Sequence, residues 1–308
     1  MKYLVRYTQH LLLLTFLFNS IFCFAQSNKH VIVPGTKCSI IPPSGFQLVN
    51  NFSGFFNQKT GASIMVNKMP TAPYRTVANG FTKEALASEG MTLISKERVH
   101  FNNAEATFAK IKQSANNTTY HKLMLLFSIS NGVIMINGIY PEGSENEQKI
   151  KEAIFSTIYN EKQNDDPLDA VPFKIDISGT DLKYTEYMSG SLLYSVEGKM
   201  PTTSPALIVG SSFAKVSTNK REYSIKRLKK LPRGESNVIK SINEIKIDGI
   251  SGYEIEANGI SKDGEENLVY LVLLYNSDNY YILLGTANEA FENNLKQFKK
   301  AVKTFKRK

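Results

Sequence analysis

The sequence has no tryptophan and only two cysteines among its 308 residues. Cys23 lies in an N-terminal apolar segment, and Cys38 follows that segment. If the segment is removed, Cys38 has no partner within the chain, so an intramolecular disulfide is excluded. Packed apolar cores must then hold the fold, and the chain is long enough to form two. Because Cys38 lies in a strand-like run, we interpret it as a small buried hydrophobe rather than a reactive thiol.

Motifs of catalysis and of metal or nucleotide binding are also missing. The chain has no His-Glu-x-x-His, no Cys-x-x-Cys, no Gly-x-Ser-x-Gly elbow, no Walker A loop and no Gly-x-Gly-x-x-Gly. After the N-terminal segment the histidines are His30, His100 and His121, too far apart for paired ligands. The sequence therefore predicts no catalytic residue, no metal site and no cofactor. We interpret His121 as a residue at the edge of a strand.

Long apolar runs are absent except for one at the N-terminus. That run covers residues 11–24 and follows Lys2 and Arg6, with no acidic residue nearby. It is shorter than the roughly 20 residues that a membrane-spanning helix needs, which disfavours an uncleaved anchor. The pattern of a basic start and a short apolar run is typical of a secretory signal peptide.

The residues after this run predict where the signal peptide is cleaved. Cys23 and Ala25 place small side chains at the two positions that a signal peptidase requires. Lipidation of Cys23 is the weaker alternative, because the bulky Phe22 precedes it. We expect a signal peptide over residues 1–25, cleaved after Ala25, and an exported protein that is periplasmic or extracellular.

What the sequence does contain is an internal repeat. Residues 128–138 and residues 275–285, which lie 147 positions apart, both read as an apolar strand, a polar turn, a second apolar strand and a glycine. Residues 52–55 and 188–191 match upstream, and an apolar run follows each of them. These matches occur in the same order in both halves, which indicates a duplication, and a period this long predicts two whole domains.

A polar, acidic segment that contains Pro167 separates the two halves. Such composition is typical of a linker between domains. We therefore predict a first domain over residues 26–160, a linker over 161–170 and a second, diverged domain over 171–308.

Each half contains strands that are apolar on nearly every residue, at 123–129 and 269–275. Such strands are buried on both faces, so helices should cover both sides of the sheet. One helix is expected early in each half, over 74–88 with a stop at Gly90 and over 219–231 with a stop at Pro232. A final amphipathic helix is expected in each half from two apolar stripes, which are Ile150, Ile154 and Ile158 in the first and Phe291, Leu295, Phe298, Val302 and Phe305 in the second.

The order of these elements is strands, helix, strands and terminal helix, with short turns between consecutive strands. This order predicts the α+β class, as two tandem α/β/α sandwiches, each a mainly antiparallel sheet with helices on both faces.

The element order and the opening segment Ile41-Pro42-Pro43-Ser44-Gly45-Phe46 resemble the PsbP-like superfamily, whose domains start with a similar proline–glycine–aromatic pattern. The resemblance covers most of the first half and the latter part of the second. The second half departs at its start, where residues 177–181 lack the prolines. The resemblance implies a binding or assembly role, and none of the superfamily's functional residues match positions in this chain.

The net charge is +9, and the second half contains two basic clusters, at residues 220–233 and 296–308, both on expected helices. Solvated helix faces explain such clusters most simply. They also suggest an anion-binding face for anionic lipid, an acidic glycan or an acidic protein. Nucleic acid is disfavoured, because no nucleic-acid motif accompanies the clusters. The residues assigned to this possible face are Lys226, Arg227, Lys229, Lys230, Arg233, Lys299, Lys303 and Lys306.

Three hypotheses of function follow from the sequence. The first is an exported, non-enzymatic binding or assembly protein of the bacterial envelope, whose partner is a protein or an envelope component. The second is a module that binds an anionic membrane surface or a glycan through the basic helices at 220–233 and 296–308. The third is a hydrolase whose catalytic residues are dispersed along the chain, since triads are assembled in space and not in sequence.

Overall fold

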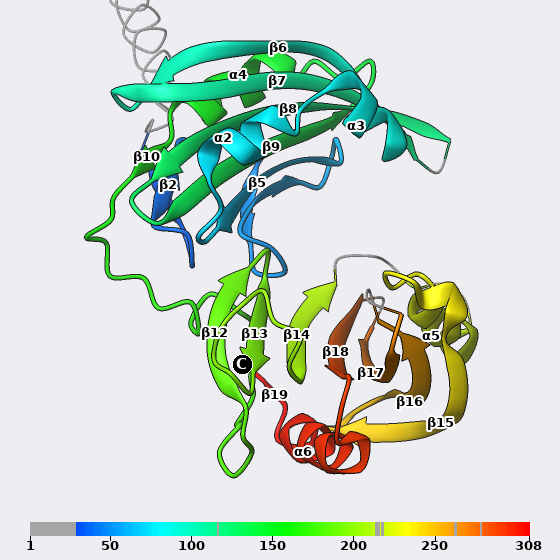
Figure 1. Cartoon of the computed structure of the whole chain (residues 1–308). Helices are drawn as coiled ribbons and strands as arrows, with labels where there is room; N and C mark the ends of the chain where they lie inside the picture. The colour runs from blue at the N-terminus through cyan, green and yellow to red at the C-terminus, as the bar shows by residue number, and fades with distance from the viewer. Residues whose placement is uncertain (1–28, 116, 213–215, 217–218, 262–263, 278) are drawn as a thin grey trace, which may run out of the picture. The chain divides into compact units, whose positions relative to one another are not determined.

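Two seven-stranded antiparallel sheets, one in each half of the chain, make up most of the fold (Figure 1). The computed structural model describes residues 29–308 except 116, 213–215, 217–218, 262–263 and 278, so the predicted signal peptide lies outside the described residues. The first sheet contains β3 (Gln47–Val49), β4 (Gly54–Asn57), β5 (Ala62–Met69), β6 (Met91–Phe101), β7 (Ala104–Ala115), β8 (Thr118–Ile129) and β9 (Gly132–Pro141). The second contains β12 (Lys183–Met188), β13 (Ser191–Ser195), β14 (Ala206–Ser212), β15 (Val238–Ile247), β16 (Ile250–Ile260), β17 (Glu266–Asn276) and β18 (Asn279–Ala287).

The two sheets have the same topology. Their strand orders are β3-β4-β5-β9-β8-β7-β6 and β12-β13-β14-β18-β17-β16-β15, so in each the third strand pairs with the seventh. The central hairpins close at Ile129–Gly132 and at Asn276–Asn279, again 147 positions apart. A duplication explains why both sheets share this strand order and this crossover. The early strands of the second half occupy the expected places, although its first residues lack the prolines.

Short strands complete each half. A small sheet in the first half joins β1 (Val31–Val33), β2 (Cys38–Ile40) and β10 (Ile158–Tyr159), and β11 (Phe173–Lys174) pairs with β19 (Lys306–Arg307) in the second. Two sequence predictions are corrected here. Ile158 lies in β10 and is 49% exposed, so it does not continue the helical stripe. Lys306 lies in β19 and not on a helix.

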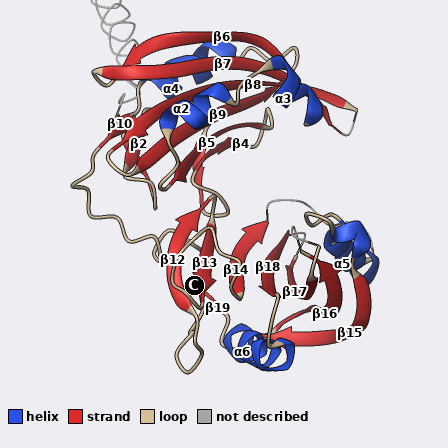
Figure 2. Ribbon diagram, viewed as in Figure 1, coloured by secondary structure: helices blue, strands red, loops and turns tan. Residues whose placement is uncertain are grey.

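Helices cover both faces of each sheet (Figure 2). They are α2 (Tyr74–Asn79), α3 (Lys83–Ser88), α4 (Glu147–Phe155), α5 (Lys220–Lys229) and α6 (Phe291–Lys303), with a short 3₁₀ helix η1 (Gly234–Ser236) after α5. The fold is therefore α+β, as predicted. The single helix expected over 74–88 is wrong, because α2 ends at Gly80 and α3 begins separately. Thr82 starts α3 by accepting a hydrogen bond on Oγ1 from the backbone N–H of Ala85, at 3.1 Å.

Buried apolar residues form cores that each stay within one half. In the first half, one core lies between the sheet and α4, and a small one lies under α2. In the second half, one core lies between the sheet and α6, and another lies under α5. Residues 31–308 nevertheless form one compact unit, and the domain boundaries at 160 and 171 stay a prediction.

One glycine in each half lets the terminal helix approach its sheet. A Cβ on Gly285 would lie 2.5 Å from the ring of Phe298 on α6, and a Cβ on Gly138 would collide with Ile150 on α4. These glycines end the two matching sequence segments, 147 positions apart. Their conservation within the repeat has a packing reason, since a larger residue would push the helix off the sheet.

An ion pair also ties each terminal helix to its sheet, with the charges exchanged between the halves. In the first half, Lys110 on β7 pairs with Glu147 on α4 at 2.5 Å, and the hydroxyl of Tyr140 donates to the same carboxylate at 2.7 Å. In the second half, Lys299 on α6 pairs with Glu256 on β16 at 2.5 Å. The hydrogen bond from Lys110, and then that from Tyr140, lowers the pKa of Glu147.

Glu147→Gln is expected to destabilise the protein at neutral pH and to have a smaller effect in acid. A carboxylate with a lowered native pKa contributes stability above its ordinary pKa of 4.5, and this contribution is lost as the pH falls through the native value. Denaturant unfolding of both proteins at about pH 7 and about pH 4 measures the difference. A gap between wild type and variant that stays constant over this range would contradict the assignment.

Within the described part of the chain, none of the helices combines the length and the apolarity needed to cross a bilayer.

Candidate functional site

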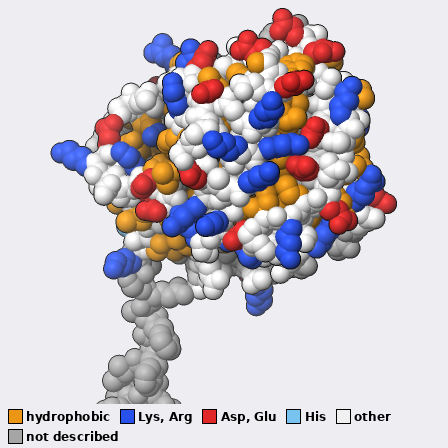
Figure 3. Space-filling view, turned by 90° about the horizontal axis from the view of Figure 1, so that it is seen from below, with side chains coloured by type: hydrophobic (Ala, Val, Ile, Leu, Met, Phe, Trp, Pro, Cys, Tyr) orange, Lys and Arg blue, Asp and Glu red, His pale blue; other side chains and the backbone are white. Residues whose placement is uncertain are grey.

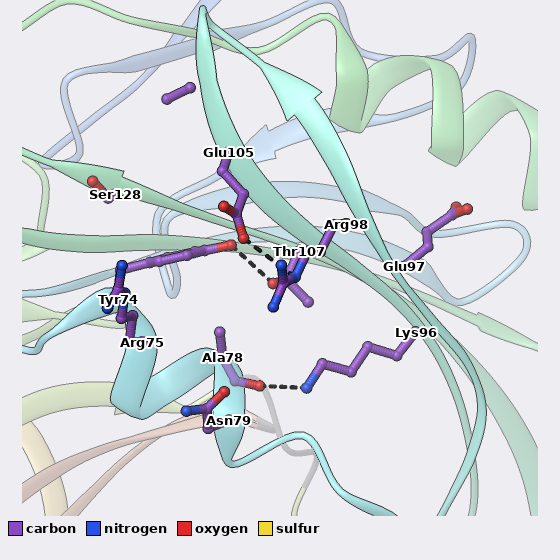
Figure 4. Close-up of a pocket in the computed structure, with 11 residues that line it drawn as sticks. Tyr74, Arg75, Ala78, Asn79, Lys96, Glu97, Arg98, Glu105, Thr107 and Ser128 are labelled. Carbon is purple, nitrogen blue, oxygen red and sulfur yellow. Dashed lines mark hydrogen bonds and ion pairs between the residues drawn. The ribbon is translucent and has the colours of Figure 1, made fainter.

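A polar groove of about 710 Å³ opens on the first half, between α2 and the strands β6, β7 and β8 (Figure 4). Its floor includes Thr107 on β7 and Ser128 on β8. Helix α2 forms one wall and β6 forms the other. The residues that line it are Tyr74, Arg75, Ala78, Asn79, Lys96, Glu97, Arg98, Ala104, Glu105, Thr107 and Ser128.

Hydrogen bonds across the groove hold its two walls together. The hydroxyl of Tyr74 on α2 lies 2.9 Å from the hydroxyl of Thr107, and Lys96 on β6 donates to the carbonyl of Ala78 at 2.7 Å. That carbonyl belongs to the last turn of α2, where a cation interacts favourably with the helix dipole. The walls are therefore braced by side chains from three elements, and the groove is preorganised.

The groove carries charges of both signs. Arg98 and Glu105 face each other across the β6–β7 hairpin at 3.4 Å, with 85% and 58% of their side chains exposed (Figure 4). An ion pair this exposed contributes little to stability, so both groups are available to a ligand. Among the described residues, no acidic side chain pairs with Arg75 on α2, which leaves a guanidinium at the rim.

Comparison of the two repeats explains why the groove exists. Ser128 corresponds to Tyr275 on β17, 147 positions later, and both precede the turn of the central hairpin. Tyr275 is buried, and its hydroxyl lies 2.7 Å from Ser224 and 2.8 Å from the carbonyl of Lys220, both on α5. Ser128 is exposed and lines the groove. The same surface is thus sealed in the second half and open in the first.

The helices above these two surfaces differ for the same reason. In the second half the face of β17 carries Val269, Leu271 and Leu273, all buried under the ten-residue α5. In the first half, α2 has six residues, and the small core beneath it contains Leu126 from β8. A short helix over a partly polar face cannot cover that face, so a concave polar surface remains.

The residues that the sequence assigned to an anion-binding face lie elsewhere, and the structure does not bring them together. Helices α5 and α6 pack on opposite faces of the second sheet, so no single face presents both clusters. In one view of the molecule, Lys and Arg side chains are interspersed with Asp and Glu rather than gathered into one patch (Figure 3).

Several of these cations also have partners within the protein. Lys299 pairs with Glu256 at 2.5 Å. Lys229 donates to the carbonyls of Glu235 and Asn237, and Arg233 donates to the carbonyl of Ser261. Anion binding by the eight residues stays a prediction, and they are Lys226, Arg227, Lys229, Lys230, Arg233, Lys299, Lys303 and Lys306.

His121 is the histidine that bears most directly on the hydrolase hypothesis. It lies on β8, stacks on Tyr140 and places Nε2 3.4 Å from a carboxylate oxygen of Glu142. Glu142 also pairs with Lys112 at 2.9 Å. Among the described residues, no hydroxyl or thiol hydrogen-bonds either ring nitrogen, so the geometry offers a base without a nucleophile. The residues that the structure describes also contain no cluster of three or more side chains that could bind a metal ion.

Cys38 is buried, as the sequence predicted. Its side chain is 0% exposed, and burial raises the pKa of the thiol to about 12. Such a thiol is poorly ionised and takes no part in the groove.

Sequence reasoning missed the groove, because its residues come from four separate segments and form no motif. One signal was present in the repeat. The positions of β8 that match Val269, Leu271 and Tyr275 are Lys122, Met124 and Ser128, so one face of the strand is more polar in the first half. Reading that difference as an uncovered surface requires knowing that these positions face α2.

Comparison with protein-family models gives no match, and comparison with curated proteins gives none. Similar solved structures include cyanobacterial PsbP from Synechocystis sp. PCC 6803, at 13% identity and a TM-score of 0.31, over 40% of this chain and 87% of that chain. The protein PA94 from Pseudomonas aeruginosa matches at 12% identity and a TM-score of 0.30, over 59% of this chain and 94% of that chain. The T6SS immunity protein TplEi from Pseudomonas aeruginosa, complexed with "L" peptide, matches at 10% identity and a TM-score of 0.32, over 86% and 98%.

Proposed function

We propose that this chain is an exported, non-enzymatic binding protein of the bacterial envelope that holds a protein partner in the groove of its first half. The observation that carries the proposal is the contrast between Ser128 and Tyr275. The same surface is closed by a tyrosine and a long helix in one repeat, and is open, polar and braced in the other. The basic start at Lys2 and Arg6 and the apolar run at 11–24 support the export part of the proposal.

A polypeptide suits this groove better than an anionic surface does. Arg75, Lys96 and Arg98 lie there together with Glu97 and Glu105, so a ligand in the groove meets charges of both signs. One wall is β6, an edge strand of the first sheet, and residues 94–98 of this strand are exposed in succession. An extended segment of a partner can therefore contact the side chains of the groove and the backbone of an edge strand at once.

Filling the groove, or reversing a charge at its rim, is expected to weaken capture of the partner. Ser128→Tyr imitates the residue of the second repeat, and Arg75→Glu reverses the unpaired charge. Either change should weaken binding by at least about tenfold, because the tyrosine fills the groove and the glutamate repels the acidic groups of the partner. The measurement is quantitative pull-down of the tagged protein from envelope extracts, followed by titration of the captured protein against each variant.

Arg221→Glu is the matched control, because Arg221 is an exposed cation on α5 in the second half. It should leave capture unchanged. Equal capture by wild type and both groove variants would refute the groove as the binding site. Loss of capture in the Arg221 variant alone would instead favour the hypothesis that the basic helices bind the partner.

A further inference from the structure

Strand β6 is a free edge of the first sheet, beside the groove. It ends the order β3-β4-β5-β9-β8-β7-β6, so one side of β6 pairs with β7, and none of the described strands pairs with its other side. Residues 94–98 and His100 are exposed along this edge. An edge strand presents unpaired backbone N–H and C=O groups, which can pair with a strand of another chain.

The hairpin between β6 and β7 fixes which backbone groups are free. It closes at Phe101 and Ala104 through a two-residue turn, in which both residues have positive φ, at 50° and 61°. The residues that flank such a turn form a hydrogen-bonded pair, and bonded pairs recur at every second position. Phe101 and every second residue before it, back to position 97, therefore bond to β7. The residues between them direct their backbone groups to the free side, and they are Lys96, Arg98 and His100.

The side chains of the same three residues share the face of the sheet that carries the groove. Side chains alternate between the two faces along a strand. Val99 packs against the core on the α4 side, so residues 96, 98 and 100 lie on the opposite face. In Figure 4, Lys96 extends toward Ala78 on α2, and Arg98 lies beside Thr107. Basic side chains thus lie next to the free backbone groups of β6.

The matching edge strand of the second repeat lacks this basic row. Its hairpin closes at Ile247, 146 positions after Phe101. The positions that match the three basic residues are Ile242, Glu244 and Lys246. Ile242 packs against the core under α5, and the hydroxyl of Tyr253 donates to Glu244 at 3.3 Å. The fold of the repeat therefore does not require basic residues at this edge.

The two edge strands also differ at the bulge that interrupts each of them. The bulge lies at Ile94 in β6 and at Lys240 in β15. A lysine at an edge opposes pairing with another chain, whereas Ile94 is apolar and 47% exposed. Lys96 is drawn away from the edge, because its ammonium donates to the carbonyl of Ala78 at 2.7 Å. Strand β6 is therefore the less protected of the two edges.

We infer that the free edge of β6 binds an extended segment of the partner as an eighth strand of the first sheet, with acidic side chains at alternate positions of that segment. Residues opposite each other on paired strands point to the same face, where opposite charges attract and like charges repel. Such a segment meets the basic side chains of residues 96, 98 and 100, while Glu105 lies one strand further away, on β7. The inference rests on the proposed function, because the segment belongs to the partner that the groove holds.

Three capped seven-residue peptides test the inference, with amide hydrogen exchange of the whole chain as the readout. In each peptide threonine alternates with a second residue, which is glutamate, glutamine or lysine. The glutamate peptide should slow exchange at the amides of Lys96, Arg98 and His100 by at least about tenfold, because these N–H groups gain hydrogen bonds. The amides of Glu97 and Val99 already bond to β7 and should be unchanged. The glutamine peptide should bind about tenfold more weakly, and the lysine peptide should give no protection.

Variants at Arg98 separate the backbone contact from the charge. Arg98→Pro removes one outward N–H, at an edge position where proline is tolerated, and should weaken the glutamate peptide by at least about tenfold. Arg98→Gln keeps the N–H and should weaken the glutamate peptide but not the glutamine peptide. Glu244→Pro, at the matching position of β15, is the control and should bind the glutamate peptide as the wild type does.

Protection that is equal with the lysine peptide would overturn the inference. So would binding in the groove without protection of the three outward amides, or no binding of any peptide. These outcomes are distinct from failure of the proposed function, which is tested by capture of the partner. If Ser128→Tyr and Arg75→Glu weaken capture while no peptide protects β6, the groove stands as the binding site and strand addition is refuted. If neither variant weakens capture, the proposed function itself is refuted.

Discussion

Phe298→Ala is expected to lower the free energy of unfolding by about 3–5 kcal/mol, the usual cost of truncating a buried aromatic side chain. Phe298 is 0% exposed in the core between α6 and the second sheet. Its ring lies over Gly285 on β18, in the space that a Cβ would occupy. Denaturant unfolding, followed by circular dichroism, measures the loss.

Because Phe298 contacts Gly285, substitutions at these two positions should have strongly coupled effects on stability. Gly285→Ala alone should destabilise by about 1–3 kcal/mol, since the added methyl overlaps the ring. In the Phe298→Ala background the same change should be neutral or stabilising by up to about 1 kcal/mol, as alanine is usually better than glycine inside a strand. The double-mutant cycle isolates this coupling.

Ser251→Ala is the control for the cycle, because Ser251 is an exposed residue of β16 in the same sheet. Its effect should be small and should add to that of Phe298→Ala. If the effects of Gly285→Ala and Phe298→Ala simply add, the close approach of α6 to the sheet is not what constrains the glycine.

Cys38 in the native protein is expected to react with iodoacetamide at least about a thousandfold more slowly than an exposed cysteine. Burial raises the pKa of its thiol from 9.0 to about 12, which lowers the thiolate fraction near neutral pH by that factor. The side chain is also 0% exposed, so the reagent reaches the sulfur only rarely, which slows the reaction further. The rate is measured by mass spectrometry on a chain that begins at Gln26, in which Cys38 is the single cysteine. Denaturant should restore the reactivity of an exposed cysteine.

The pH dependence of this reaction has a defined sign. The native rate should still rise about tenfold per pH unit above pH 9, because the buried thiol is far from fully ionised there. A cysteine placed at the exposed position Ile32, in a Cys38→Ala background, should level off above pH 9 instead. A native Cys38 rate that matches this control would contradict the burial of the thiol.

The sequence by itself determined the class and the plan of this protein. The repeat of 128–138 in 275–285 predicted two related sheets, and the topologies agree strand for strand. The strand at 269–275 is apolar on both of its faces, which predicted helices on both sides of the sheet. Helices α5 and α6 cover those two sides. Such patterns are readable because burial on a strand or a helix imposes a short, regular period on the chain.

Only the tertiary structure decided which surfaces are open. The sequence left open whether the basic clusters at 220–233 and 296–308 share one face, and α5 and α6 pack on opposite faces of the sheet. The groove of the first half depends on how far a short helix covers the sheet beneath it. That coverage is set by contacts between segments distant in sequence, such as the contact of Tyr74 with Thr107. Such contacts leave no periodic pattern in the sequence.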